Sequence, residues 1–319
     1  MKARVFWKKD STSAKFLRVN SFYDKKGFII QRDKVYFVNQ DIILAMIQTS
    51  HLFPVLDEKL IQLLRSLNSE DWERKTISPK WTIKDIAAHL LDGNIRSLSM
   101  LRDGYYGEKP EKVNSYADLL DFLNGLNTDW VKAMRRVSPR LLVDLLEITG
   151  KAYCAHIASL PPLEPAAFSV AWAGEDVSLN WFHVAREYTE KWHHQQQIRL
   201  AVDLESELFQ AELYRPYLET SMLALPHHYR KMEAEDNTLI KIQVRGEGGG
   251  DWWLIRKTDA WELVIHPDKM PDAAVSIPGE IAWRIFTKGI TKEEAKLLVE
   301  ISGQKHLGEH ILSMLAVMA

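Results

Sequence analysis

Hydrophobic residues recur at helical spacing in the segment that follows the first forty residues. Residues 56–67 repeat leucines every three or four positions and end before Asn68, which predicts a first helix. A second helix is predicted from Thr82, because Thr82 can cap its N-terminus and Asp85, three residues later, completes a capping box. The apolar stripe that follows predicts that one face of this helix is buried.

Two more helical stretches are predicted. The third covers 115–137, is interrupted at Ser138-Pro139 and continues over 141–160, and the fourth runs from about 180 to 201. Helices joined by polar connections are typical of a bundle, so a four-helix bundle is predicted for residues 39–232.

The hydrophobic period changes from helical to alternating after Met232. Alternation of apolar and polar residues predicts four strands, at 238–244, 252–256, 261–266 and 273–277. Helical patterns follow at 279–288, from Thr291, and from Gln304 to the end. The glycine run 246–250 predicts a hairpin turn, since it lacks the Gly-Lys-Ser/Thr of a phosphate loop. Residues 233–319 therefore form a small α/β domain, and the fold class is α+β.

Residues 1–38 differ in charge from the rest of the chain. They carry ten Lys or Arg against three Asp or Glu, while the remainder has 31 basic and 40 acidic residues. Residues 29–38 are predicted to be strand. A basic arm with aromatic residues could contact nucleic acid, which is the weaker interpretation. A peripheral hairpin, or residues upstream of a later natural start such as Met46, are the favoured alternatives.

Composition excludes some kinds of site. The chain of 319 residues has one cysteine, Cys154, so neither an internal disulfide nor a cysteine metal cluster can form. The sequence has no Gly-x-Ser-x-Gly motif, and no Cys/His pair can be placed for nucleophilic catalysis. There is no apolar run that could span a bilayer, and the N-terminus lacks the apolar core of a secretory signal. We therefore expect a cytoplasmic protein with no membrane partner.

The helix predicted at 180–201 carries the most informative polar residues. Trp181 and Trp192 lie on one face, and Glu190 and His194, four residues apart, lie on the opposite face. A carboxylate and an imidazole so placed can bind one divalent cation such as Zn²⁺, Ni²⁺ or Fe²⁺. The alternative is a solvated polar face. His193 is a second possible ligand, although helical spacing turns it away from that face.

His89 is the candidate third ligand, on the second predicted helix. A lone histidine at the edge of an apolar stripe is more often a hydrogen-bonded boundary residue, and Asp85 is better explained as a cap than as a ligand. Two ligands from one helix and one from another would leave coordination positions open, as in catalytic metal sites. His227-His228 follows Pro226, and we interpret this pair as a solvated helix end.

Two segments resemble a known family. SEDWERKTISPKWTIKDIAAHLLDG (69–93) is similar to the start of the DinB superfamily bundle, especially the N-terminal domain of mycothiol-dependent maleylpyruvate isomerases. REYTEKWHHQQQIR (186–199) resembles the later Glu-x-x-x-His helix of that family. The glycine-rich turn between strands and the segment 301–315 resemble the sterol-carrier-protein-like domain often fused to it.

The resemblance implies a function. It implies that His89, Glu190 and His194 bind a divalent metal, most often zinc, and that a low-molecular-weight thiol such as mycothiol takes part in isomerisation or S-transfer on a small electrophilic substrate. The resemblance identifies no catalytic residue in this chain beyond the three metal ligands. The alternative is a non-catalytic protein that binds a metal and an apolar ligand.

Overall fold

The computed structural model describes residues 28–31, 34–37, 46–110, 112, 115–265 and 267–317. The chain divides into two compact units, one made of Met1–Met46 with Pro110–Leu119 and the other of Ile47–Lys109 with Leu120–Ala319. Among the described residues, no helix is both long and apolar enough to cross a membrane.

The first unit contains a short hairpin. Strands β1 (Phe28–Gln31) and β2 (Lys34–Phe37) are antiparallel, and Ile29 is paired with Tyr36. The prediction of one continuous strand over 29–38 is therefore wrong, and the antiparallel pair agrees with the hairpin, which is one of the two favoured alternatives. Residues 1–27, which hold most of the basic arm, lie outside the described residues.

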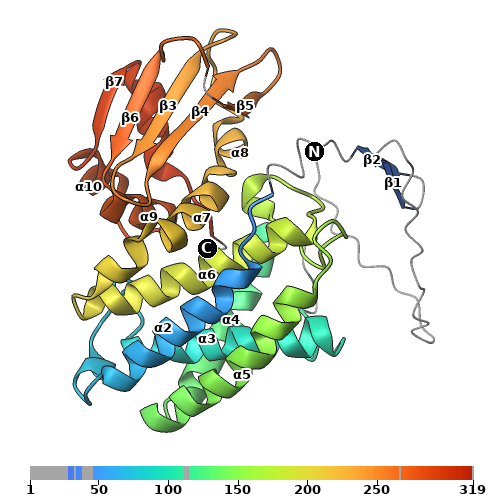
Figure 1. Cartoon of the computed structure of the whole chain (residues 1–319), viewed down its shortest axis with the longest axis vertical. Helices are drawn as coiled ribbons and strands as arrows, with labels where there is room; N and C mark the ends of the chain where they lie inside the picture. The colour runs from blue at the N-terminus through green and yellow to red at the C-terminus, as the bar shows by residue number, and fades with distance from the viewer. Residues whose placement is uncertain are drawn as a thin grey trace. The chain divides into compact units, whose positions relative to one another are not determined.

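The second unit begins with a helical region (Figure 1). Its long helices are α2 (Phe53–Ser66), α3 (Ile83–Ser97), α4 (Tyr116–Met134, whose first residues belong to the first unit), α5 (Pro139–Ser159) and α6 (Asn180–Ala201). Helices α2 and α3 each pack against both α5 and α6. The two halves of the third predicted stretch are thus separate helices. They divide where Ser138 caps α5 and Pro139 occupies its first position.

Helix α3 begins at the predicted capping box. The Thr82 hydroxyl accepts a hydrogen bond from the Asp85 amide at 3.3 Å, and the Asp85 carboxylate accepts one from the Thr82 amide at 3.1 Å. The interpretation of Asp85 as a cap is confirmed. A five-residue π-helix, Leu98–Arg102, extends the end of α3.

Helix α6 is buried around almost its whole circumference. Trp192 and Tyr188 are fully buried, as are His183, Thr189 and Gln196 on its other sides. The interpretation of its polar face as solvated is therefore wrong. A polar face inside a protein must find hydrogen-bond partners or a ligand there.

Two helices that the sequence analysis did not predict connect the helical region to the sheet. They are α7 (Ala211–Met222), which packs against α6, and the short α8 (Leu225–Tyr229). His228 lies in α8, half-buried, with its Nε2 2.8 Å from the carbonyl of His310. The interpretation of this pair as a solvated end is wrong for His228.

A five-stranded mixed sheet follows, in the order β5-β4-β3-β6-β7. Its strands are β3 (Leu239–Val244), β4 (Gly250–Arg256), β5 (Trp261–Val264), β6 (Ala273–Ile277) and β7 (Glu300–Gly303). The parallel pair is β3 with β6, and the other neighbours are antiparallel. The glycine run forms the predicted β3–β4 turn, where Gly246 has a φ of 105°.

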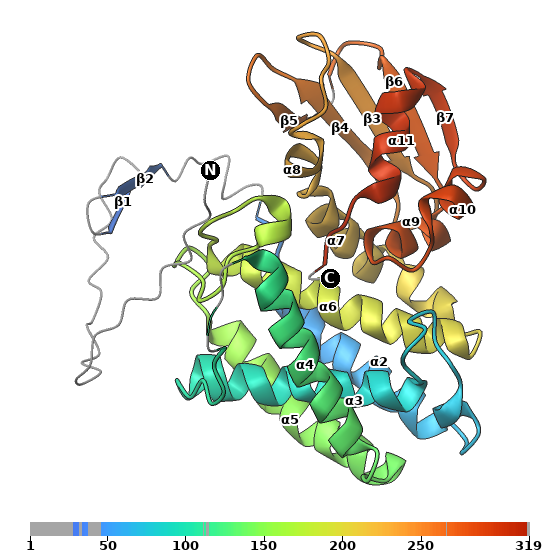
Figure 2. The same ribbon diagram turned by 180° about the vertical axis from the view of Figure 1, so that it is seen from behind.

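Helix α11 (Lys305–His310) packs against β6 and β7 on one face of the sheet (Figure 2). The other helices of this region are α9 (Gly279–Phe286) and α10 (Lys292–Lys296). The prediction of a helix from Gln304 to the end is wrong, because α11 ends at His310 and the described residues after it form a short 3₁₀ turn without further helix. Strand β7 was also missed, since four residues with one apolar member, Ile301, give no alternation.

The helical region and the sheet share one hydrophobic core. It runs from Phe53 and Tyr153 through Trp192 to Ile240 and Trp283, all below 2% exposed. Hydrogen bonds join the same parts, since the hydroxyl of Tyr214 on α7 donates to the carbonyl of Gly279. The fold is thus α+β, with a helical region followed by a small mixed sheet.

Candidate metal centre

Two histidines from different helices meet inside the helical region. The ring centroids of His89 on α3 and His194 on α6 are 4.7 Å apart, with an interplanar angle of 72°. Trp81, just before α3, lies 4.8 Å from the His89 ring and 6.1 Å from the His194 ring. The indole therefore covers both imidazoles on one side.

Glu190 completes the group from one turn earlier on α6. Its Oε2 is 3.7 Å from Nε2 of His194. This separation exceeds a hydrogen bond. It is close to the roughly 3.3 Å expected between two ligand atoms at metal–ligand distances of about 2.0–2.1 Å.

His193 also belongs to this group. Ligand atoms of Glu190, His193 and His194 all lie within 4.8 Å of one another, and the two imidazole centroids are 4.0 Å apart. The prediction that His193 is turned away from the other two residues is therefore wrong. Glu190 and His193, three residues apart, are on adjacent turns of the same side of α6.

Oxygen atoms hold the Nδ1 atoms of both α6 histidines. Nδ1 of His194 is 2.9 Å from Oε1 of Gln197, and Nδ1 of His193 is 2.9 Å from the carbonyl of Thr189. An acceptor oxygen at Nδ1 selects the tautomer in which Nδ1 carries the proton. In that tautomer Nε2 has a free lone pair, which is how proteins orient metal-binding histidines.

His89 has a polar atom that its surroundings leave unsatisfied. Its Nδ1 is buried and has no hydrogen-bond partner among the described residues. Leaving a buried polar atom unpaired typically costs about 1–3 kcal/mol. An ion beside His194 would supply the missing partner, so the donor set fits a divalent metal.

The protonation of these imidazoles also suits metal binding. Burial lowers the pKa of His89 well below its usual value, and the neighbouring His194 and Arg96 lower it further. Burial and then His193 lower the pKa of His194, and burial lowers the pKa of His193 to about 4. All three rings are therefore neutral near pH 7, and only a neutral imidazole can act as a ligand.

A buried ion pair lies further along the helical region. Nζ of Lys191 is 2.9 Å from Oδ1 of Asp57 on α2, and also 2.9 Å from Oδ1 of Asn94 on α3. The thiol of Cys154 lies 3.4 Å from the second carboxylate oxygen of Asp57, and burial raises its pKa to about 12. This cysteine is therefore a protonated thiol at neutral pH.

A second polar group lies one to two turns before Glu190 on α6. The Glu187 carboxylate accepts hydrogen bonds from Arg186 at 2.8 Å and from the Tyr153 hydroxyl at 3.0 Å. Arg186 also donates to Nδ1 of His183 at 2.7 Å. These contacts pair the Glu187 carboxylate inside the helical region.

The structure brings the rings of His89 and His194 together from α3 and α6 and places Glu190 beside His194, whereas the group whose ligand atoms all lie within 4.8 Å of one another is Glu190, His193 and His194. The sequence analysis did not identify Trp81 or Gln197, which contact the ligands. Gln197 follows His194 by three residues, a spacing that could have indicated the contact. Trp81 precedes His89 by eight residues across a helix cap, and no spacing rule predicts that contact.

Most of the helical region matches the model of a known protein family. Residues 53–199 match the family described as the mycothiol maleylpyruvate isomerase N-terminal domain. The predicted resemblance to this family is confirmed. The match to the mycothiol maleylpyruvate isomerase domain runs from α2 into the last turn of α6 and includes His89, Glu190 and His194.

Two solved structures are similar to the chain. They are crystal structures of the mycothiol-dependent maleylpyruvate isomerase and of a histidine-to-alanine mutant of it. Each is 11% identical, with a TM-score of 0.43, and covers 74% of this chain and 86% of the other. A comparison with curated proteins gave no significant match.

Proposed function

We propose that His89, Glu190 and His194 bind a divalent metal, with zinc as the first candidate. The protein would use this metal together with a low-molecular-weight thiol to isomerise or conjugate a small electrophilic molecule. The observation that carries the proposal is the meeting of the His89 and His194 rings at 4.7 Å, beside the Glu190 carboxylate. It is supported by the match of residues 53–199 to the mycothiol maleylpyruvate isomerase domain.

Three ligands from two helices leave coordination positions for water or substrate, which is typical of catalytic zinc. A divalent metal held by these residues would supply Lewis-acid chemistry that lowers the pKa of water or a thiol toward neutrality. A thiolate that adds to a conjugated double bond forms a C–S bond, and the π electrons move to the conjugated carbonyl oxygen as an enolate. Rotation about the former double bond and expulsion of the thiolate would give cis–trans isomerisation, whereas protonation of the enolate at carbon would give S-transfer.

The chain's own residues have separate tasks in this proposal. Gln197 fixes the ring of His194, and the Thr189 carbonyl fixes that of His193. Trp81 covers the imidazoles and excludes water from that side. Glu190 acts as a metal ligand rather than as a general base. His193 lies close enough to act as a fourth ligand, which would close the site.

The proposal is tested with purified protein, first assayed for bound metal. The protein is then given maleylpyruvate together with mycothiol, bacillithiol or glutathione. The rate at which maleylpyruvate is consumed is compared between the wild type, His194→Ala and His51→Ala. His51 is an exposed histidine and serves as the control. Turnover that His194→Ala abolishes and His51→Ala retains supports the enzyme. Bound metal without turnover on any of the three thiols contradicts it.

A second candidate function is a non-catalytic binding protein in which the metal has a structural role. The observation that favours it is a surface pocket of about 430 Å³, lined by Ile285, Ile290, Leu312 and Leu315 beside Lys288 and Lys292. This volume is within the range of small-molecule sites. A sterol-carrier-like role of the sheet domain predicts that a fluorescent fatty acid binds there. The Ile290→Trp variant, whose larger side chain fills the pocket, should no longer bind it.

A further inference from the structure

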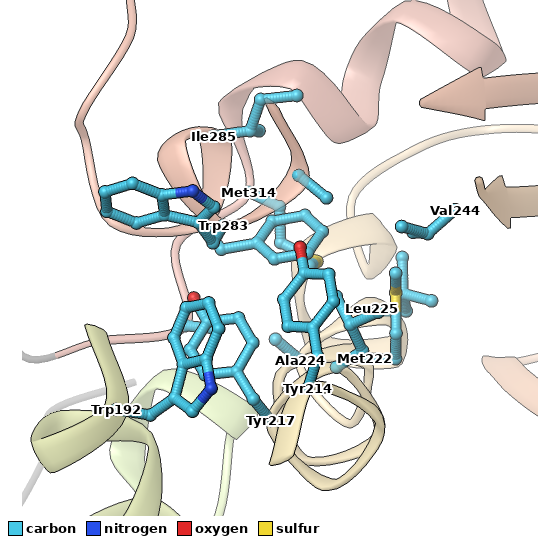
Figure 3. Packing of buried hydrophobic residues seen from close by; sticks show 14 of the residues in the cluster. Trp192, Tyr214, Tyr217, Met222, Ala224, Leu225, Val244, Trp283, Ile285 and Met314 are labelled. Atoms are coloured by element: carbon cyan, nitrogen blue, oxygen red, sulfur yellow. The ribbon is translucent and has the colours of Figure 1, made fainter. Parts of the chain in front are cut away.

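Two tryptophans near the candidate metal centre have different surroundings. Trp192, on α6 itself, is fully buried and is stacked on Tyr217 with 4.3 Å between ring centroids, in an aromatic cluster that includes Trp283 (Figure 3). Trp81, which precedes α3, is half-buried, and its ring centroid is 4.8 Å from that of His89. Trp192 therefore belongs to the hydrophobic core, whereas Trp81 keeps part of its surface exposed beside a candidate ligand.

The indole of Trp81 is within reach of a molecule bound to the metal. A metal about 2.0–2.1 Å from a ring nitrogen of His89 lies roughly 3 Å from the centre of that imidazole. Because the two ring centroids are 4.8 Å apart, the metal is at most about 8 Å from the centre of the indole. A small organic molecule held by the metal spans that distance, so its body can contact the indole.

Solvent reaches the side chains of the candidate centre. His89 and Trp81 are half-buried, and the side chain of Glu190 is 30% exposed, although that of His194 is only 11% exposed. A molecule that arrives from solvent meets these partly exposed side chains, of which the indole has the largest apolar surface. Trp81 is therefore the aromatic wall of the centre.

A tight turn holds the backbone of Trp81. Its amide donates to the carbonyl of Ser78 at 3.0 Å, and its carbonyl accepts hydrogen bonds from the amide of Thr76 at 3.1 Å and from the hydroxyl of Thr76 at 3.0 Å. The next residue, Thr82, caps α3. The backbone of Trp81 is thus fixed on both sides before a ligand binds, which lowers the entropy cost of binding.

An apolar residue at this position can also stabilise the start of α3. Trp81 directly precedes the N-cap residue Thr82, and Ile86, the fourth residue of α3, is fully buried, which is the arrangement of a hydrophobic staple. A staple needs an apolar side chain but not an aromatic one. Leucine at position 81 would keep the staple and remove the flat aromatic surface, so this change separates the two roles.

We infer that the indole of Trp81 stacks on the organic part of the ligand bound at the candidate metal centre. It selects ligands whose metal-binding group is attached to a flat unsaturated or aromatic group. Stacking needs two flat π systems, so a saturated ligand of the same charge and similar size gains less from the indole. The inference rests on the proposed function, because the metal holds the ligand. It adds a specificity-determining residue that does not itself bind the metal.

The test compares two carboxylates that differ mainly in flatness, benzoate and cyclohexanecarboxylate. The full chain is loaded with Co²⁺, whose visible absorption reports changes in its ligands, and is titrated with each carboxylate. The wild type should bind benzoate about 2- to 10-fold more tightly, which corresponds to one aromatic pair. Trp81→Leu should bind the two carboxylates with nearly equal Kd, and Trp81→Phe should keep most of the preference. Both variants should keep the wild-type affinity for Co²⁺.

Trp181→Leu is the matched control. Trp181 is also half-buried and is stacked on Phe182 with 5.2 Å between ring centroids. It lies on α6 thirteen residues before His194, about 20 Å along the helix axis. Since its indole is remote from the centre, this variant should keep the wild-type preference for benzoate.

Equal Kd values for the two carboxylates in the wild type overturn the inference, as does a preference that Trp81→Leu retains. A cobalt spectrum that responds to neither carboxylate also overturns it, because the centre would then accept no ligand of this class. A lower melting temperature of Trp81→Leu with an unchanged preference overturns it in favour of a purely structural role. A wild type that binds no Co²⁺ refutes the proposed function, and the inference with it.

Discussion

The imidazoles of His89 and His194 face each other edge to face at 4.7 Å, although they belong to different helices. Neither ring hydrogen-bonds to the other, and burial holds both neutral by lowering the pKa of each. Two uncharged imidazoles beside a carboxylate, one half-buried and one buried, form a poor hydrophobic core and a good divalent-metal site. The predictions below test this interpretation and the structure that supports it.

Gln197 should contribute to metal affinity without being a ligand. Gln197→Ala removes the oxygen that holds Nδ1 of His194, so the ring can rotate and its tautomer is no longer fixed. We expect zinc affinity, measured by competition with a chelating dye, to fall about 10- to 100-fold. Gln196→Ala is the control, because Gln196 is equally buried on α6 but bonds to the carbonyl of Glu205. Equal zinc affinities in wild type and Gln197→Ala would contradict the assignment.

The ion pair of Asp57 and Lys191 should behave as a buried pair. Asp57→Ala leaves the ammonium of Lys191, whose side chain is 9% exposed, without its counter-charge. We expect the free energy of unfolding in urea to fall by about 3–5 kcal/mol. Adding Lys191→Met should recover much of this loss. Glu147→Ala, which breaks the exposed pair with Arg65, should cost at most about 1 kcal/mol. Similar losses for the two single variants would refute the distinction.

The capping box at the start of α3 should stabilise the helix that carries His89. Thr82→Ala removes the acceptor for the Asp85 amide, and we expect a loss of about 1 kcal/mol in urea unfolding. Thr128→Ala, an exposed change on α4, should stay within about 0.5 kcal/mol of the wild type. No difference between these two variants would show that the cap contributes nothing.

Acid should destabilise the metal-free protein partly through His183. Burial lowers the pKa of His183 to about 4, against an ordinary value near 6.5. Between these values the unfolded chain binds a proton that the folded chain does not, so stability is lost as the pH falls from 6.5 toward 4. His183→Asn keeps an acceptor for Arg186 but cannot titrate. The drop in unfolding free energy between pH 7 and pH 5 should be smaller in this variant by about 1–2 kcal/mol. An identical drop in both proteins would rule out this contribution.

Local signals in the sequence predicted the elements that contain them. Thr82 and Asp85 predicted the start of α3, and Ser138-Pro139 predicted the break before α5, because capping chemistry is confined to a few neighbouring residues. The alternation of Ile240, Ile242 and Val244 predicted β3, whose burial follows the same pattern. Strand β7 has no such signal. Its place at the edge of the sheet depends on pairing with β6, which is a long-range contact.

The candidate site was predicted in part. The spacing of Glu190 and His194 placed them on one face of α6, but the family resemblance was needed to favour His89 as the third ligand, because no rule of spacing links residues on separate helices. An idealised helical wheel turned His193 away, whereas the side chain reaches back to within 4.8 Å of its neighbours. Helix α7, which packs against α6, was not predicted at all. The boundaries 39–232 and 233–319 remain predictions, and one core runs across them.

The central claim is that three side chains from α3 and α6 hold one cation. It is tested most directly by a crystal structure of the zinc-loaded protein with anomalous scattering measured at the zinc edge. We expect one anomalous peak about 2.0–2.2 Å from an atom of each of His89, Glu190 and His194. A peak held by Glu190 and His193 with His89 turned away from it, or no peak among these residues, would contradict the account.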